Sequence, residues 1–202
     1  MNGRPPAVWV VVLIKGFDAA KQRLRPALDP ESRRRLAVNN AGRALKAALA
    51  GDHVLAVCGS EEAADLARGQ GAEVLLESRP AGQNPAAGLG LAHAAAGGAD
   101  AVLLLSSDLP LVAGDDLARM IRRGRQLGPR AALAAAASGR GGTNALYLRP
   151  PDVLGLHFGE ASLEKFSADA AARSVPFEIY ESPRLALDLD EPSDLEVLRA
   201  VR

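Results

Sequence analysis

Cysteine, aromatic side chains and net charge are all scarce in this chain of 202 residues. The single cysteine, Cys58, has no partner for an internal disulfide, which favours a reducing cytoplasm. Lysine plus arginine equals aspartate plus glutamate at 24 each, so no global field attracts nucleic acid or a membrane surface. No apolar run approaches the roughly 20 residues that span a bilayer, and residues 1–7 lack the apolar stretch of a signal peptide. We therefore expect a cytoplasmic protein that binds neither nucleic acid nor a membrane.

Small aliphatic residues are abundant instead. Hydrophobic residues make up 48% of the chain and aromatics only 3%, so the core must consist mostly of alanine, valine and leucine. Such residues suit layered helices and strands, and this length is enough to bury a sizeable core. The chain shows no internal repeat, low-complexity linker or break in composition. A single domain over residues 1–202 is the simplest interpretation.

Strand and helix patterns alternate along most of the chain. Short apolar runs predict strands at Val8–Ile14, 54–58, Glu73–Leu76, Ala101–Ser106, 131–137, 144–148 and 177–180, and an extended segment at 185–190. Helices are predicted at 30–50, 60–68, 85–96, 115–127, 162–173 and 192–201, the first two with Asp29 and Ser60 as N-caps. This alternation predicts a three-layer α/β/α fold with a mostly parallel sheet. In such sheets ligands bind beyond the carboxyl ends of the strands.

The segment that follows the first strand, KGFDAAKQRLR, is basic. It carries Lys15, Lys21, Arg23 and Arg25. Several positive donors are what a triphosphate requires, and a loop after the first strand can supply them. The glycine–lysine spacing of a P-loop is missing, and a single glycine is too few for a dinucleotide fingerprint. Charge alone leaves open a second interpretation, a solvated basic loop.

Carboxylates occur at two places that suit a metal ion. Asp108 ends a fully apolar strand, and Mg²⁺ prefers hard oxygen ligands. In an extended chain Asp188 and Asp190 share one face, and their mutual repulsion is relieved when a cation bridges them. Other interpretations remain: Asp108 caps a turn before Pro110, and Asp190 or Glu191 merely caps the final helix.

Two glycine-containing segments offer backbone N–H groups and a hydroxyl. They are GGTN at 141–144 and FGEAS at 158–162, and the second opens a helix, whose N-terminus favours phosphate. The alternative is an ordinary glycine turn with Ser162 as N-cap. The three histidines have no metal-ligand spacing, so structural roles are expected for them, and Cys58 in its apolar strand is expected to be a core residue.

Together these segments resemble the 2-phospho-L-lactate guanylyltransferase family of coenzyme F-420 biosynthesis, a MobA-like group whose actinobacterial members are phosphoenolpyruvate guanylyltransferases. The resemblance runs from about Val8 to the C-terminus and follows the family order. The matching pieces are Lys15 with Ala20-Lys21-x-Arg23-Leu24, Gly82-x-Asn84-x-Ala86, Ser107-Asp108-Leu109-Pro110, Gly142-Thr143-Asn144-Ala145-Leu146, Phe158-Gly159-x-x-Ser162, and Leu187-Asp188-Leu189-Asp190-x-Pro192-x-Asp194-Leu195.

The resemblance implies a nucleotide-diphospho-sugar-transferase-like fold, GTP as donor and a small phosphorylated acid as acceptor. It implies Mg²⁺ on three carboxylates, Asp108, Asp188 and Asp190. It further implies a triphosphate near Lys15, Lys21 and Arg23. The nucleoside would lie at Gly82 and Asn84. The acceptor's phosphate and carboxylate would lie at Thr143, Gly159 and Ser162.

The chain departs from the family pattern at several positions. Gln83 replaces a leucine, and a histidine that commonly follows the Ser162 segment is absent, with Phe166 nearby. The acceptor therefore stays open among phosphoenolpyruvate, 2-phospho-L-lactate and 3-phosphoglycerate. Two other classes remain: another MobA-like nucleotidyltransferase, whose usual glycine-rich loop after the first strand is missing here, and a catalytically silent nucleotide-binding domain. We expect a monomer or homodimer that passes its product to a downstream transferase.

Overall fold

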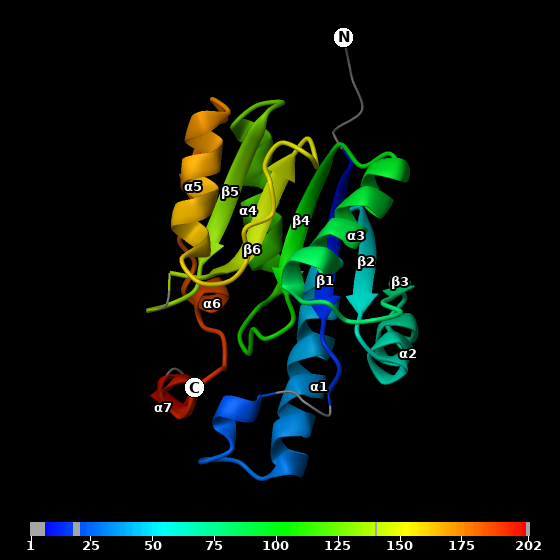
Figure 1. Cartoon of the computed structure of the whole chain (residues 1–202), viewed down its shortest axis with the longest axis vertical. Coiled ribbons are helices and arrows are strands. Elements are labelled where there is room, and N and C mark those ends of the chain that lie inside the picture. The colour runs from blue at the N-terminus through cyan, green and yellow to red at the C-terminus, as the bar shows by residue number, and fades with distance from the viewer. Residues whose placement is uncertain (1–6, 18–20, 140, 201–202) are drawn as a thin grey trace.

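The computed structural model of the chain describes residues 7–17, 21–139 and 141–200. A seven-stranded sheet forms its centre (Figure 1). Its strands, in spatial order, are β3 (Glu73–Leu76), β2 (His53–Cys58), β1 (Val8–Ile14), β4 (Ala101–Ser106), β6 (Thr143–Arg149), β5 (Ala131–Ala136) and β7 (Phe177–Ile179). Strand β6 is antiparallel to both of its neighbours, and every other pair is parallel. The predicted mostly parallel sheet is confirmed.

Helices cover both faces of this sheet. Helices α1 (Pro30–Ala48), α2 (Glu61–Gly69) and α4 (Gly114–Gln126) pack on one face, and α3 (Gln83–Ala96) and α5 (Ser162–Ala172) pack on the other. Alternate residues of β1 enter the two cores: Val10 and Val12 face α1, whereas Val11 faces α3. Because both faces of the central strands are covered, their sequences are continuously apolar. The predicted three-layer α/β/α fold is therefore confirmed.

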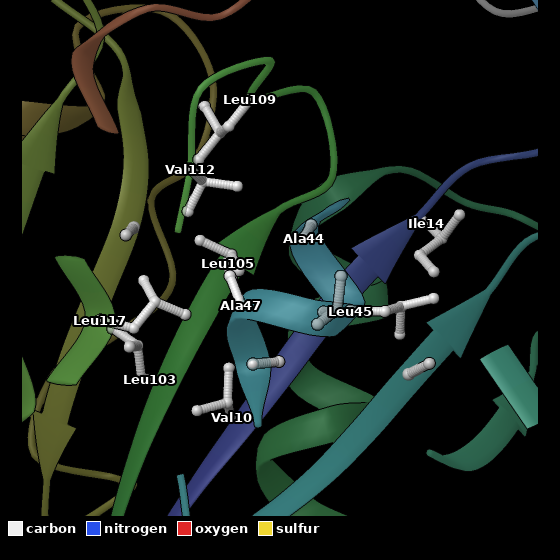
Figure 2. Packing of buried hydrophobic residues seen from close by; sticks show 14 of the residues in the cluster. Val10, Ile14, Ala44, Leu45, Ala47, Leu103, Leu105, Leu109, Val112 and Leu117 are labelled. Atoms are coloured by element: carbon white, nitrogen blue, oxygen red, sulfur yellow. The ribbon is translucent and has the colours of Figure 1, made fainter. Parts of the chain in front are cut away.

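Small residues set the spacing between the layers. Alanines of α1 and leucines of β4 fill the core on the α1 side (Figure 2). On α4, a Cβ added to Gly124 would lie 2.4 Å from the ring of Tyr147 on β6, and one added to Gly90 of α3 would lie 2.5 Å from Val11. Glycine at these two positions lets the helices approach the sheet closely, which explains how a core with few aromatics is densely filled.

Three short elements complete the fold: a 3₁₀ helix η1 (Gln22–Leu24), α6 (Pro183–Ala186) and α7 (Pro192–Ala200). Both predicted N-caps are confirmed, because Asp29 accepts from the Ser32 amide and Ser60 from the Ala63 amide. The final helix begins at Pro192 as predicted, and its predicted end at 201 lies outside the described residues. None of the described helices has both the length and the hydropathy of a membrane span.

The extended segment predicted at 185–190 is wrong in its first part. Leu185 and Ala186 belong to α6, because Ser182 caps that helix through the Leu185 amide and Pro183 occupies its first turn. Leu187 is extended, and residues 187–190 form no helix and join no strand of the sheet. Their predicted alternation holds, since Leu187 and Leu189 are buried whereas the two intervening aspartates are partly exposed.

Candidate active site

Strands β1 and β4 deliver the first site residues to one edge of the sheet. Leu13 pairs with Ser106 in the parallel ladder, so Lys15 and Asp108 both leave the sheet at its carboxyl edge. Lys15 is exposed there. The Gly59 amide, just after β2, donates to the Ile14 carbonyl at 2.8 Å and holds the two neighbouring loops together.

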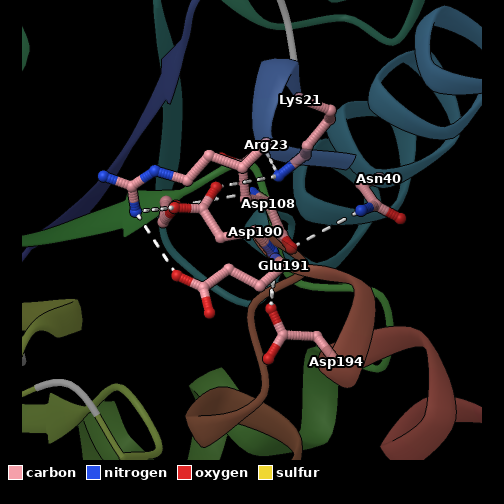
Figure 3. A network of polar contacts seen from close by, with 8 residues as sticks. Lys21, Arg23, Asn40, Asp108, Asp190, Glu191 and Asp194 are labelled. Atoms are coloured by element: carbon pink, nitrogen blue, oxygen red, sulfur yellow. Dashed lines mark hydrogen bonds and ion pairs between the residues drawn. The ribbon is translucent and has the colours of Figure 1, made fainter. Parts of the chain in front are cut away.

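Lys21 contacts two of the predicted carboxylate ligands, Asp108 and Asp190. Its backbone is left-handed (φ 57°, ψ 37°) at the start of η1, and only 2% of its side chain is exposed. Its Nζ lies 2.9 Å from Asp108 Oδ1 and 4.0 Å from Asp190 Oδ1 (Figure 3). A residue of the basic loop and two of the predicted metal ligands therefore meet at one point. Ala20, which precedes it in the same motif, lies outside the described residues.

Asp190 is held between two basic residues. Its Oδ2 lies 3.5 Å from Arg23 Nη1, on the side away from Lys21, and the same guanidinium nitrogen lies 3.8 Å from Glu191 (Figure 3). Arg23 is 68% exposed, so this ion pair is weakened by solvent. All three predicted basic residues thus reach the carboxyl edge, but only Lys21 is buried in it.

Two side chains that were not predicted as site residues fix the backbone of this cluster. The amides of Asp190 and Glu191 both donate to the buried Asp194 carboxylate at 2.7 Å, so Asp194 fixes the backbone at the start of α7. Asn40 on α1 donates to the Asp108 carbonyl at 3.4 Å, and the Leu189 amide donates to the same oxygen at 3.3 Å. Asn40 had a detectable signal, because it is a polar residue on a helix face that buries mostly alanines.

The carboxylates fit a divalent cation as a pair. Among the residues that the structure describes, no three histidine, cysteine, aspartate or glutamate side chains form a metal-ligand set. Asp108 and Asp190 nevertheless converge on a single cation, the Lys21 ammonium. Mg²⁺ needs only one or two carboxylates when phosphates and water complete its shell. Asp188 is partly exposed two residues before Asp190, and its role as a third ligand stays a prediction.

The predicted acceptor residues form a second cluster, on the β6 side of the sheet. Ser162 at the start of α5 donates to Thr143 Oγ1 at the start of β6 over 2.9 Å, and both hydroxyls are buried. The Leu163 amide donates to the Gly141 carbonyl at 3.1 Å, which ties the two glycine-containing segments together. Gly159 has φ 121°, a conformation that favours glycine. The structure therefore brings together the residues that the resemblance assigns to the acceptor.

Asn84 connects this second cluster to the start of α3. Its side-chain amide donates to the Phe158 carbonyl at 3.0 Å and accepts from the Phe158 amide at 2.8 Å. Gly82, the N-cap of α3, is exposed with φ 110°, and an added Cβ would meet open space. The two predicted nucleoside contacts thus lie beside the acceptor loop, with Asn84 bonded directly to it.

A further anchor of the acceptor loop was also missed from sequence. Asp169 on α5 accepts from the Gly155 amide at 2.7 Å, from His157 Nε2 at 3.2 Å and from Arg173 Nε at 2.6 Å. Burial raises the pKa of this carboxyl, but the hydrogen bonds from Arg173 and Gly155 outweigh it and lower the pKa below its usual value. Asp169 therefore holds the chain that leads into Phe158 and Gly159.

The weaker candidates have other environments. Burial raises the pKa of the Cys58 thiol to about 12, which suits a core residue and not a nucleophile. His53 and His93 both contact Glu73, and the hydrogen bond from His53 lowers the pKa of that carboxyl. A groove of about 1040 Å³ lies beside the site and is lined in part by Leu187 and Glu191. Lys21 and Asp108 are not among its lining residues.

Comparisons with known proteins identify relatives of this chain and of its fold. The chain is 35% identical to a phosphoenolpyruvate guanylyltransferase of Conexibacter woesei, over 96% of this chain and 87% of that protein. It is 38% identical to a 3-phospho-D-glycerate guanylyltransferase of Phenylobacterium zucineum, over 72% of this chain and 66% of that protein. A crystal structure of a putative nucleotide-diphospho-sugar transferase from Desulfovibrio desulfuricans superposes with a TM-score of 0.72 at 16% identity, covering 95% and 85% of the two chains, which confirms the fold.

The sequence profile of the family described as "Guanylyl transferase CofC like" matches residues 8–199, almost the whole chain. The match includes every residue of both clusters. The chain belongs to the CofC-like guanylyl transferase family.

Proposed function

We propose that this protein transfers the guanylyl group of GTP to the phosphate of a small phosphorylated carboxylic acid and releases pyrophosphate, in coenzyme F-420 biosynthesis. The observation that carries the proposal is the convergence of Lys21, Asp108 and Asp190 at the carboxyl edge of the sheet. Phosphoenolpyruvate or 2-phospho-L-lactate is the proposed acceptor. The relative from Phenylobacterium makes 3-phosphoglycerate the second candidate.

The proposed reaction is an in-line displacement at phosphorus. An oxygen of the acceptor's phosphate attacks the α-phosphorus of GTP, and the bond from that phosphorus to the oxygen that bridges to the β-phosphate breaks. Pyrophosphate leaves with the bond's electron pair, and the product is a diphosphate that joins guanosine to the acid. Because the attacking oxygen is already ionised at neutral pH, the step needs no protein base. The protein's task is alignment and charge neutralisation.

Each cluster has a part in this proposal. Lys15, Lys21 and Arg23 neutralise the triphosphate and the departing pyrophosphate. Asp108 and Asp190, with Asp188 as the proposed third ligand, hold Mg²⁺, which supplies positive charge to the reacting phosphates. Gly82 and Asn84 face the nucleoside, while Thr143, Gly159 and Ser162 hold the acceptor. The product then passes to a downstream cytoplasmic transferase.

The test is a substrate panel with the intact chain. The protein is incubated with GTP, Mg²⁺ and each of the three phosphorylated acids in parallel, with a downstream transferase present to trap the product. Pyrophosphate release is measured, and the product is identified by mass. We expect release with GTP and one preferred acid, and its loss with excess EDTA. ATP and CTP serve as donor controls. Folded protein that releases no pyrophosphate with any acid would refute the proposal.

A further inference from the structure

We propose that Lys21 is the built-in counter-ion of Asp108 and Asp190, and that a divalent cation binds this pair only by displacing the Lys21 ammonium. The inference rests on the proposed function, because it concerns the same two carboxylates. Beyond that function, the inference states that the metal ion replaces the ammonium at the carboxylates, so that the ammonium is released toward the phosphates of GTP.

The geometry places the ammonium where a shared cation must lie. Lys21 Nζ is 2.9 Å from one oxygen of Asp108 and 4.0 Å from one oxygen of Asp190. The Lys21 side chain is 2% exposed, whereas the Asp108 and Asp190 side chains are 36% and 39% exposed. Lys21 thus reaches the carboxylates from the protein side, and a cation from solvent reaches them from the open side. Two positive charges on the same oxygens repel strongly, so the two occupants compete.

The Lys21 ammonium is poorly satisfied where it lies. Its contact with Asp108 lacks the direction of a hydrogen bond, and the ammonium has no hydrogen-bond partner among the described residues. An ammonium has three N–H donors, and burying them without acceptors is unfavourable. Among the described residues the Lys21 ammonium is therefore held by charge, and the same two carboxylates attract a doubly charged ion more strongly than a singly charged one. A lysine with a purely structural role would be expected to bind its acceptors fully.

The backbone of Lys21 is also in a conformation that can relax. Lys21 is a non-glycine residue with φ 57° and ψ 37°, and its carbonyl accepts from the Leu24 amide in the single turn of η1. Left-handed backbone at such a residue is strained and persists only when its surroundings enforce it. The ion pair with Asp108 is one contact that holds the Lys21 side chain while its backbone has this conformation. Displacing the ammonium removes that contact and frees the side chain to move toward a bound triphosphate.

Competition between the Lys21 ammonium and a metal ion predicts that one substitution strengthens metal binding and weakens the use of GTP. Lys21→Met keeps the length of the side chain and removes its charge. Binding of Mn²⁺ or Mg²⁺ alone, without nucleotide, should tighten about tenfold or more, because one competing unit charge is gone. The KM for GTP should rise, because the phosphates lose a cation. A lysine that only contacts phosphate would leave the affinity for the metal alone unchanged.

The experiment titrates each protein with Mn²⁺, followed by electron paramagnetic resonance, and with Mg²⁺, followed by calorimetry. Arg23→Met is the matched control, since it removes an equal charge beside Asp190 from an exposed side chain. Its effect on metal affinity should be about threefold or less, because solvent screens that charge. Equal metal affinity in wild type and Lys21→Met would overturn the inference.

A measurement on the wild-type protein covers the case in which Lys21→Met fails to fold. An amine-reactive reagent is applied with and without Mg²⁺, in the absence of GTP, and labelling of Lys21 is followed by peptide mass. Exchange predicts that Mg²⁺ accelerates labelling of Lys21 and leaves exposed Lys46 unchanged as a reference. Labelling that stays the same or slows overturns the inference. Neither readout needs turnover, so failure of the proposed function would be seen separately in the pyrophosphate assay.

Discussion

The two clusters at the carboxyl edge of the sheet use different chemistry. The cluster of Lys21, Asp108 and Asp190 is ionic, with contacts of 2.9 to 4.0 Å and half-exposed carboxylates. The cluster of Thr143, Ser162 and the Asn84–Phe158 link is neutral, with hydrogen bonds of 2.8 to 3.0 Å. The ionic cluster suits the binding and release of charged groups, whereas the neutral cluster fixes the conformation of the loops that form it. We therefore expect substitutions in the ionic cluster to change rate, and substitutions in the neutral cluster to change stability and acceptor binding.

The largest effect is expected from Asp108→Asn. The change keeps the shape of the side chain and removes the charge that faces Lys21 and the proposed metal. We expect turnover to fall roughly a hundredfold or more, the scale seen when a group that stabilises transition-state charge is lost. Pyrophosphate release gives the rate, and the thermal midpoint should fall modestly, because the buried Lys21 ammonium loses its nearer counter-ion and keeps only Asp190 at 4.0 Å. Near-normal turnover in the presence of Mg²⁺ would contradict the expectation that the ionic cluster determines the rate.

The neutral cluster is tested next by Thr143→Val, which nearly preserves volume. The buried Ser162 hydroxyl loses its acceptor, which should lower the free energy of unfolding by about 2 kcal/mol. Urea unfolding at neutral pH measures the change. Thr143→Ser keeps the hydroxyl and is the control, with a smaller loss expected. Equal losses in the two variants would show that the methyl group matters there and that the hydrogen bond does not.

Asn84→Ala separates the two candidate roles of that residue. Loss of the proposed nucleoside contact should raise the KM for GTP, and loss of both hydrogen bonds to Phe158 should raise the KM for the acceptor, each about tenfold. Steady-state kinetics with each substrate varied in turn gives both values. An unchanged KM for GTP would contradict the proposed nucleoside contact, and an unchanged KM for the acceptor would contradict the role of Asn84 in holding the acceptor loop.

The smallest effect is expected from Asp169→Asn, and it depends on pH. The pKa of Asp169 is lowered in the folded protein, so its contribution is fully present above its unfolded pKa of about 3.9 and is lost as the pH falls through the lower folded value. The variant should be less stable than wild type by about 1 kcal/mol between pH 5 and 8. Denaturant unfolding at pH 7 and pH 3 should show that this difference shrinks in acid. A constant difference would contradict the assignment.

Much of the fold could be predicted because its signals are local. The continuous apolar run Val8–Ile14 indicates a strand covered on both faces, and it is the central strand β1. Asp29 and Ser60 each cap a helix through the amide three positions later, within reach of sequence reasoning. The segment at 185–190 was harder, because a leucine–alanine run suits a strand or a helix until Ser182 and Pro183 decide its start.

The residues of the site could be predicted from sequence, but most of the contacts between them could not. Motif order places Lys21 with the carboxylates, yet nothing in the sequence indicates that its ammonium lies between Asp108 and Asp190, which are 82 residues apart in the chain. Asn84 bonds to Phe158, 74 residues away, and Asp194 acts through backbone amides. Such partners depend on the packing of distant elements. A pattern of residue types does not encode them.

The antiparallel direction of strand β6 affects which segments of the chain supply each cluster of the site. Because β6 runs opposite to β4, its first residue, Thr143, reaches the edge where β4 delivers Asp108. The ionic cluster draws on widely separated parts of the chain. By contrast, most of the neutral cluster comes from one uninterrupted stretch, residues 131–179, which contains β5, β6, α5 and β7. We expect that exchanging this stretch between relatives would change the choice of acceptor and would leave in place the residues proposed to bind the nucleotide.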